Sequence, residues 1–261
     1  FPTRRSSDLL QAERVSNQLR EFGYDQVIVK KVVVTTQSGI EAGARDARYK
    51  AFEKSMAEEK AVKVFLGHTH NDQAETVLLG LARGSGTRSL SGMAEDNGNY
   101  CRPLLAITRD ETEKACQELG ITFWSDPHNF DTEFTRVRVR REVIPFLESH
   151  LDPGISKALV RSAALFRDDA DALDEWAAKE WDRLKVLECD YLSGLPRAIR
   201  TRIIRLAAYE AGVSQGTLTA EQVGAVEALI SAWRGQGAIA LSGGVKVERI
   251  SGRLTLSKDP V

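Results

Sequence analysis

The stretch that decides the fold runs from Ala61 to Thr76 and reads AVKVFLGHTHNDQAET. Its first six residues form a short apolar run that predicts a buried strand, and residues 72–81 predict a helix. In parallel sheets covered by helices, ligands bind at the carboxyl ends of the strands. Because His68 and Asp72 follow the strand directly, we expect a binding site there.

The polar residues after this strand suit more than one purpose. A histidine, an aspartate and a helix N-terminus at one place can bind a phosphate, a magnesium ion or an amine. A purely structural turn between a strand and a helix needs only one capping residue. Asn71 or Asp72 is able to cap the first turn of the helix, and the alternative interpretation is that Asp72 is only a cap and that His68 stands there by chance.

The segments before this stretch continue the same alternation. They predict a helix over residues 10–22, a strand over 27–36 and a helix over 40–59. Helices alternating with strands imply an α/β fold with a Rossmann-like parallel sheet and flanking helices.

The segments after it predict a loop and then helices. Residues 83–99 are rich in glycine and predict a loop, and residues 109–119 predict a helix capped by Thr108. Residues 121–124 are a short apolar segment, and residues 133–150 predict a basic helix that Pro145 bends or divides.

The C-terminal part predicts a long helix and a smaller α+β domain. Apolar side chains on one helical face predict a helix over residues 155–187. Beyond it the pattern predicts helices over 196–211 and 220–233, strands over 238–241, 245–250 and 254–256, and turns at 243–244 and 251–252. We therefore predict a first domain over residues 10–150, a helical linker over 151–190 and a small domain over 191–261.

The composition excludes several classes of protein. With 42% hydrophobic and 28% charged residues, the 261-residue chain is typical of a soluble globular protein, which we interpret as cytoplasmic, without a membrane-bound part. Cys101, Cys116 and Cys189 stand too far apart for a zinc, iron–sulfur or dithiol motif. A net charge of −1 argues against a uniformly basic nucleic-acid binder, so local patches must decide.

Residues 68–76 resemble the HxxDDQxET signature of the tRNA isoleucine-lysidine synthetases, a branch of the PP-loop ATP pyrophosphatase superfamily. Asn71 stands where that family usually shows the first of two acids. Further blocks of the family occur in order between residues 39 and 147, and the segment after Pro196 resembles the domain that follows. These blocks are GIEAGARDARY at 39–49, GSG at 84–86, LSGM at 90–93, RPLL at 102–105, DPHN at 126–129 and RVRVRREVIP at 136–145.

The resemblance implies a two-step reaction on tRNA(Ile) with a CAU anticodon. The C2 oxygen of cytidine 34 attacks the α-phosphate of ATP, and the ε-amine of free L-lysine then displaces AMP to give lysidine. The resemblance implies ATP and Mg²⁺ as cofactors and no membrane partner. It leaves open whether the protein is a homodimer. Arginines suit the phosphoryl charge, and a carboxylate suits magnesium or the lysine ammonium.

The site residues follow from the matching positions. We expect His68, Asp72 and Arg48 to act in catalysis and Asp72 to be the candidate magnesium ligand. We expect ATP to be bound by Arg45, Arg48, His68, Gly84, Arg136 and Arg140.

Each of these expectations has a structural alternative. Arg45 and Arg48 share a helix face and could be surface residues paired with Asp46 or Glu41. Arg136 and Arg140 share one side of a basic helix, with Arg138 and Arg141 on another, and the helix could simply be solvated. The loop containing Gly84 could be a connection, and Glu75 could be a supporting residue or exposed helix surface.

Two features concern the beginning of the sequence. Residues 1–9, FPTRRSSDL, match the translation of a common sequencing adapter, so we expect the natural sequence to begin near Leu10. The SGGxDS phosphate loop of PP-loop enzymes does not precede Gly39, and Ser242-Gly243-Gly244 resembles only its first half, within a hairpin turn. We therefore expect a sheet without its first strand, exposed sheet edges, and no useful rate of lysidine formation by this chain alone.

Two other functions compete with this one. A PP-loop thiolase or amidotransferase acting on another RNA or nucleotide is one, although the three cysteines are badly spaced for thiolase chemistry. A non-catalytic RNA-binding fragment that uses the arginines at 136–141 is the other.

Overall fold

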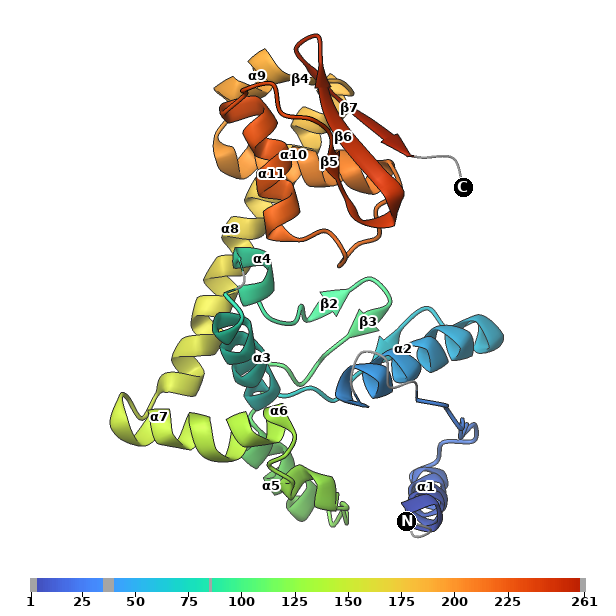
Figure 1. The fold of residues 1–261 in the computed structure, drawn as a ribbon. Coiled ribbons are helices and arrows are strands. Elements are labelled where there is room, and N and C mark those ends of the chain that lie inside the picture. Colours follow the sequence, from blue (N-terminus) through green and yellow to red (C-terminus); the bar gives the residue numbers. More distant parts are fainter. Residues whose placement is uncertain (1–3, 35–39, 85, 259–261) are drawn as a thin grey trace. The chain divides into compact units, whose positions relative to one another are not determined.

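The computed structural model describes residues 4–34, 40–84 and 86–258, and it is a mostly helical chain with two small sheets (Figure 1). The chain forms two compact units. One contains residues 1–72 and 94–142, and the other contains residues 73–93 and 143–261.

In its described residues the first unit contains four whole α-helices, three short strands and irregular segments. Its elements are α1 (Arg4–Glu21), α2 (Ile40–Glu59), β1 (Val64–Phe65), β2 (Asp96–Asn97), β3 (Tyr100–Cys101), α5 (Arg109–Glu118), a 3₁₀ turn (Pro127–Phe130) and α6 (Thr135–Arg138). The predicted helices over 10–22, 40–59 and 109–119 are confirmed. Thr108 caps α5 through a reciprocal capping box with Glu111, because two backbone N–H groups gain acceptors there.

The sheet of the first unit has the order β1-β3-β2. Strand β1 is parallel to β3, with Val64 opposite Tyr100, and β2 is antiparallel to β3. The predicted strand within residues 61–66 and a parallel pairing are therefore confirmed, but the sheet is mixed. Within the described residues β1 pairs on one side only, and Phe65 is 68% exposed.

The predicted strand over residues 27–36 is wrong where the structure describes it, since residues 26–34 belong to neither a helix nor a strand. Residues 35 and 36 lie outside the described residues. β-branched residues favour an extended backbone, but a strand also needs a partner that completes its hydrogen bonds. Among the described residues this segment has none. Val33 is 85% exposed, while Lys30 forms an ion pair with Glu58 of α2.

The predicted loop over residues 83–99 is also partly wrong, because it contains α4 (Thr87–Leu90) and β2. Both elements are too short to produce a periodic pattern. In the second unit, Arg88 of α4 forms ion pairs with Asp171 and Asp174. Contacts distant in sequence therefore hold a segment whose composition is typical of a loop.

Gly92 in this segment is required by its surroundings. Its φ of +63° lies in the left-handed region, and an added Cβ would lie 2.6 Å from Oε1 of Gln73. The Gln73 amide accepts a hydrogen bond from Met93 N at 2.8 Å and donates one to Met93 O at 3.0 Å. Nη2 of Arg167 donates to the carbonyls of Ser91 and Gly92. The loop is thus fixed at three consecutive residues.

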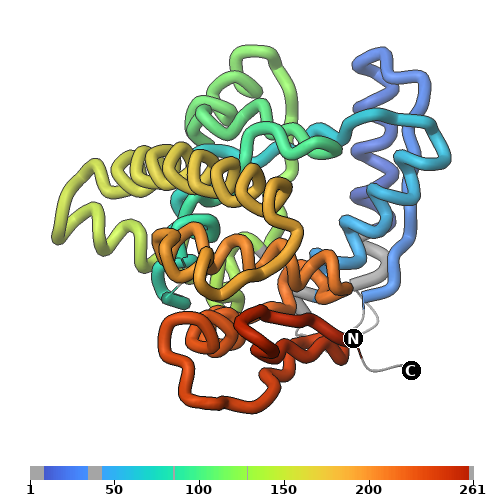
Figure 2. Tube along the Cα trace, turned by 90° about the horizontal axis from the view of Figure 1, so that it is seen from above, coloured from blue at the N-terminus to red at the C-terminus, as the bar shows by residue number. Residues whose placement is uncertain are grey.

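The second unit begins within α3 (His70–Ala82), whose first residues belong to the first unit. Its remaining elements are α4, α7 (Ile144–His150), α8 (Ile155–Leu184), β4 (Leu187–Glu188), α9 (Cys189–Gly194), α10 (Arg197–Glu210), α11 (Ala220–Ser231), β5 (Ile239–Ala240), β6 (Val245–Ile250) and β7 (Arg253–Lys258). Helix α8 is one unbroken helix of 30 residues (Figures 1 and 2), which corresponds to about 45 Å.

The predicted basic helix over 133–150 is divided, as expected. A π-helical turn over Val139–Val143 separates α6 from α7, and Pro145 follows it near the start of α7. Proline has no N–H group to donate into the preceding turn, which explains the interruption at this place.

The antiparallel sheet of the second unit has the order β4-β7-β6-β5. The three predicted C-terminal strands are confirmed, and β4 was not predicted because it has only two residues. Ser251 and Gly252 both have positive φ, at +47° and +80°, as a tight turn between right-twisted strands requires. The sheet packs on α10 and α11 through a core that includes Ile199, Ile203, Leu229, Val245 and Val247.

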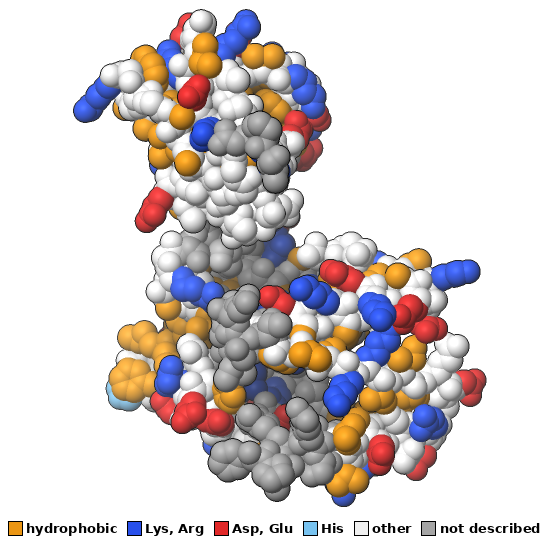
Figure 3. Space-filling view, turned by 45° about the vertical axis from the view of Figure 1, so that its right-hand side comes forward, with side chains coloured by type: hydrophobic (Ala, Val, Ile, Leu, Met, Phe, Trp, Pro, Cys, Tyr) orange, Lys and Arg blue, Asp and Glu red, His pale blue; other side chains and the backbone are white. Residues whose placement is uncertain are grey.

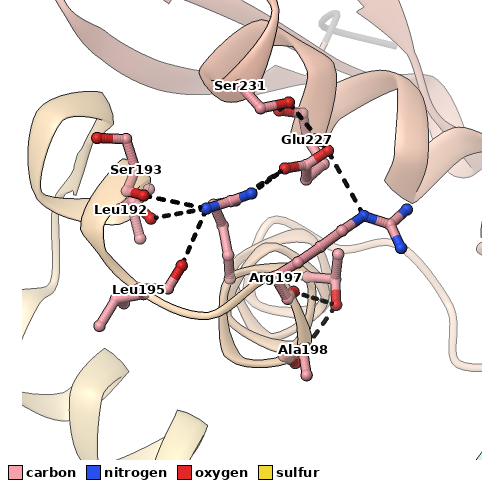
Figure 4. Close-up of polar contacts among 9 residues, drawn as sticks. Leu192, Ser193, Leu195, Arg197, Ala198, Glu227 and Ser231 are labelled. Atoms are coloured by element: carbon pink, nitrogen blue, oxygen red, sulfur yellow. Dashed lines mark hydrogen bonds and ion pairs between the residues drawn. The ribbon is translucent and has the colours of Figure 1, made fainter.

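A buried ion pair lies inside this core (Figure 4). Nε of Arg200 donates to Oε1 of Glu227 at 2.8 Å, and Nη1 of Arg200 donates to carbonyls at the end of α9, those of Leu192, Ser193 and Leu195. The hydroxyl of Ser231 donates to Oε2 of Glu227. Arg200 therefore joins α9, α10 and α11.

The surface carries charges of both signs. On the face drawn in Figure 3, basic and acidic side chains are interspersed over the described residues. Across those residues, no helix combines the length and apolar character that crossing a bilayer requires.

Candidate active site

The site lies at the carboxyl ends of the two parallel strands. After the last paired residues of β1 and β3, Leu66 N still donates to Cys101 O at 2.8 Å, so the two chains leave the sheet side by side. His68 follows one strand and Arg102 follows the other. The imidazole of His68 and the guanidinium of Arg102 therefore follow the two strands at the predicted position of the site.

The first turn of α3 fixes the Asp72 carboxylate. Oδ2 of Asp72 accepts hydrogen bonds from the backbone N and the Oγ1 of Thr69, each at 2.9 Å. Thr69 precedes the helix, and Asp72 is its third residue, which is the reciprocal half of a capping box. The helix begins at His70 rather than at Asp72. The predicted role of Asp72 as the residue before the helix is therefore wrong, because Asp72 lies in the first turn and accepts hydrogen bonds from Thr69.

Asn71 serves a different helix. Its Oδ1 accepts from Arg109 N at 2.9 Å, at the first residue of α5. The residue that replaces an acid of the family signature therefore satisfies an otherwise unpaired helix N–H group.

Two arginines meet the other oxygen of Asp72. Nη2 of Arg140 lies 3.2 Å from Oδ1, and Nη2 of Arg136 lies 3.6 Å from it and donates to the backbone oxygen of Asp72 at 3.0 Å. Arg138 instead donates to Thr132 O, and Arg141 lies 4.6 Å over the ring of Phe130. The predicted division of the arginine cluster into two sides is confirmed.

The charges in this site favour an ionised Asp72. Burial alone would raise its pKa, but the two hydrogen bonds from Thr69 and the charges of Arg136 and Arg140 outweigh that effect and lower the pKa. The carboxylate is therefore negative at neutral pH.

His68 is driven in the opposite direction, toward the neutral imidazole. Burial is the largest cause that lowers its pKa, and the positive charges of Arg102, Arg136 and Arg45 add to it, while Asp72 acts against them. Its Nδ1 is buried and has no hydrogen-bond partner within the described part of the chain. A neutral imidazole can accept a proton, which is what a general base needs.

This protonation state predicts a pH dependence of stability. The folded pKa of His68 lies below its ordinary value of about 6.5. As the pH falls through 6.5 the unfolded chain takes up the proton first, so stability is highest above that pH and is lost toward the folded pKa. Urea unfolding from pH 7.5 to 5.5 should therefore show a steeper loss for the wild type than for His68→Gln; parallel curves would contradict the buried neutral imidazole.

Helix α2 brings one of its two predicted arginines toward this site. The positive charge of Arg45 contributes, after burial, to lowering the pKa of His68. Its guanidinium lies 4.8 Å over the ring of Tyr49, and that ring contacts the ring of Tyr100 on β3. Arg48 is exposed and, within the described residues, makes no hydrogen bond or ion pair. Neither arginine forms a salt bridge with Asp46 in the described residues, while the side chain of Glu41 lies outside the described ones, so the surface-pair alternative stays open.

Two family models match separate stretches of the chain. Residues 5–147 match the model of the PP-loop domain, and residues 187–255 match that of the TilS substrate binding domain. The tRNA(Ile)-lysidine synthase of Thermobifida fusca is 48% identical over 252 residues, which are 95% of this chain and 78% of that protein. The tRNA(Ile)-lysidine synthase of Streptomyces coelicolor is 51% identical over 95% of this chain and 72% of its own length.

The chain belongs to the tRNA(Ile)-lysidine synthase family. The resemblance inferred from residues 68–76 and the blocks around them is thereby confirmed, and the thiolase alternative is not favoured. A solved structure, the U34-tRNA thiolase NcsA from Methanococcus maripaludis, has a TM-score of 0.48 and 18% identity over 62% of this chain and 57% of its own. A likeness at that level carries no argument about function.

The remaining predicted residues of this family member have clear positions. Glu75 is fully buried, so the alternative of exposed helix surface is wrong. Gly84 has a φ of +66° and open space around it. No group of three or more metal-ligating side chains gathers anywhere in the described ranges.

Two residues of the site were missed from the sequence. Thr69 had a signal, because Thr69 and Asp72 have the spacing of a capping box. Arg102 stands in the family block RPLL at 102–105, but nothing in that block indicates that its side chain is buried.

Proposed function

We propose that the chain acts as a tRNA(Ile)-lysidine synthase, which uses ATP and lysine to convert cytidine 34 of tRNA(Ile) to lysidine. Membership of the family supports this function. The observation that carries it is the pairing of an ionised Asp72, fixed by Thr69 and two arginines, with a neutral His68 at the same strand end.

In the first step, the C2 oxygen of cytidine attacks the α-phosphorus of ATP and pyrophosphate leaves. Negative charge on the phosphoryl oxygens must be stabilised while the new bond forms. Arg136, Arg140, Arg45 and Arg48 are the guanidinium groups that we assign to this task, and the ATP contact at Gly84 stays a prediction. Arginine suits it because its planar donors can hold two oxygens at once.

In the second step, the ε-nitrogen of lysine forms a bond to C2 of the cytosine ring, and AMP leaves with the former C2 oxygen. Asp72 holds the lysine ammonium beside the ring. An ammonium has no lone pair, so a base must remove a proton before attack. We assign that proton transfer to His68, whose neutral state fits an acceptor.

Magnesium is expected to arrive with the ATP phosphates. The chain offers no cluster of three protein ligands in its described residues, and Mg²⁺ usually binds through one or two carboxylates together with phosphates. Asp72 is the carboxylate we would assign to it in the adenylation step. A homodimer stays a prediction.

Transfer-RNA recognition separates this function from simple RNA binding. We expect the chain to bind tRNA(Ile) with a CAU anticodon at least about 10-fold more tightly than the same tRNA with a changed anticodon, at about 0.15 M salt. Phosphate attraction alone would be equal for both and would weaken steeply with salt. Equal affinities would favour the RNA-binding fragment and contradict specific recognition.

No SGGxDS phosphate loop occurs among the 261 residues. For assays of catalysis we define the joined enzyme as this chain fused to the part of the Thermobifida fusca synthase outside the matched region.

A further inference from the structure

Arg102 is a buried cation that no carboxylate neutralises within the described residues. It is 5% exposed, and no ion pair involves it. Nη1 donates to Ala94 O at 2.8 Å, its backbone N donates to Glu95 O at 2.7 Å, and its Nε is buried without a hydrogen-bond partner. The guanidinium is thus held in place while most of its donors stay unused.

A buried arginine that serves only the fold has different surroundings. Arg200 is similarly buried, at 8% exposure, but it pairs with Glu227 and donates to three carbonyls (Figure 4). A charge taken out of water without such compensation opposes folding. Arg102 therefore weakens the fold, and such a cost is expected at functional sites.

The position of Arg102 indicates what its charge serves. It leaves β3 beside the chain that leads from β1 to His68, and its positive charge adds to burial, the largest cause, in lowering the pKa of His68. Nδ1 of His68 is also buried without a partner. The carboxylate of Asp72, at the same end of the sheet, is paired with Thr69, Arg136 and Arg140 rather than with Arg102.

We propose that Arg102 is a further substrate-binding residue, whose unpaired charge receives an oxyanion that arrives with a substrate. The proposal rests on the proposed function, which supplies two such oxyanions, the phosphoryl groups of ATP and the carboxylate of lysine. A guanidinium fixed before the ligand binds needs no rearrangement to bind either one.

The test measures ligand binding to the joined enzyme by titration calorimetry, so it does not depend on turnover. The ligands are ATP with adenosine as its uncharged counterpart, and lysine with lysinamide, which lacks the carboxylate. The variants are Arg102→Met and Arg102→Lys. We expect Arg102→Met to weaken one anionic ligand at least 10-fold, its uncharged counterpart less than twofold, and Arg102→Lys to restore part of the affinity.

The pattern identifies the source of the oxyanion. A loss confined to ATP assigns Arg102 to a phosphoryl group, and a loss confined to lysine assigns it to the carboxylate. Unchanged affinities for both overturn the proposal. A wild-type joined enzyme that binds neither ligand overturns the proposal and the proposed function together, whereas intact wild-type binding that Arg102→Met leaves unaltered removes only the role of Arg102.

Thermal unfolding tests whether Arg102 has a structural role instead. Because Arg102 has no ion pair to lose, we expect Arg102→Met to melt at or above the wild-type temperature. Arg200→Met is the matched control, since it removes a buried arginine that is fully paired, and it should melt well below the wild type. A fall for Arg102→Met as large as that for Arg200→Met would show that Arg102 serves the fold and would overturn the proposal.

Discussion

Replacing Asp72 with asparagine is expected to lower lysidine formation by the joined enzyme by about 10²- to 10³-fold. The substitution keeps an acceptor for the Thr69 hydrogen bonds but removes the negative charge that would hold the lysine ammonium. It also leaves the charges of Arg136 and Arg140 uncompensated at this point. Two charge-assisted interactions at roughly 1.5–2 kcal/mol each give about 3–4 kcal/mol, which corresponds to that loss in rate.

Asn71→Ala is the matched control for this experiment. It removes a neighbouring side chain of the same helix turn that caps α5 and carries no charge. We expect a loss of about 1 kcal/mol in the free energy of unfolding and a rate within about threefold of the wild type. Equal rates for Asp72→Asn and the wild type, measured with labelled lysine, would remove Asp72 from the chemistry.

Replacing Arg200 with methionine is expected to lower the free energy of unfolding of the second unit by about 3–5 kcal/mol. Glu227 would then be a buried carboxylate without its main partner, and the carbonyls at the end of α9 would lose their donor. The effect is large because the ion pair lies inside the core between α9, α10 and α11. Urea unfolding followed by circular dichroism measures it.

The double variant Arg200→Met with Glu227→Leu provides the control for that result. Removing both charges leaves no buried unpaired ion, because Arg197, the other partner of Glu227, is exposed, so much of the lost stability should return. A single variant as stable as the wild type would mean that Arg200 and Glu227 do not form the pair described here.

The sequence predicted those elements whose signals are local. Helix α2 and the strand Val245–Ile250 have the predicted bounds, and Thr108 caps α5 as predicted. Side-chain periodicity and capping residues act within a few positions, so they can be recognised without knowing the fold.

The errors have one physical origin, which is dependence on distant partners. The β-branched run over residues 27–34 has no strand beside it within the described residues, and the glycine-rich segment is ordered by Arg88 and Arg167. The charge balance at Asp72 and the burial of Arg102 likewise depend on segments far apart in the sequence. The family motif placed His68 and Asp72, but only the structure showed what surrounds them.

The most direct test of the account is transfer of lysine to tRNA(Ile) by the joined enzyme. With ATP and labelled lysine we expect label to enter tRNA(Ile) at cytidine 34, and digestion with mass spectrometry should identify lysidine there. The same tRNA with a changed anticodon should stay unlabelled. Label in both transfer RNAs, or in neither, would contradict the assignment.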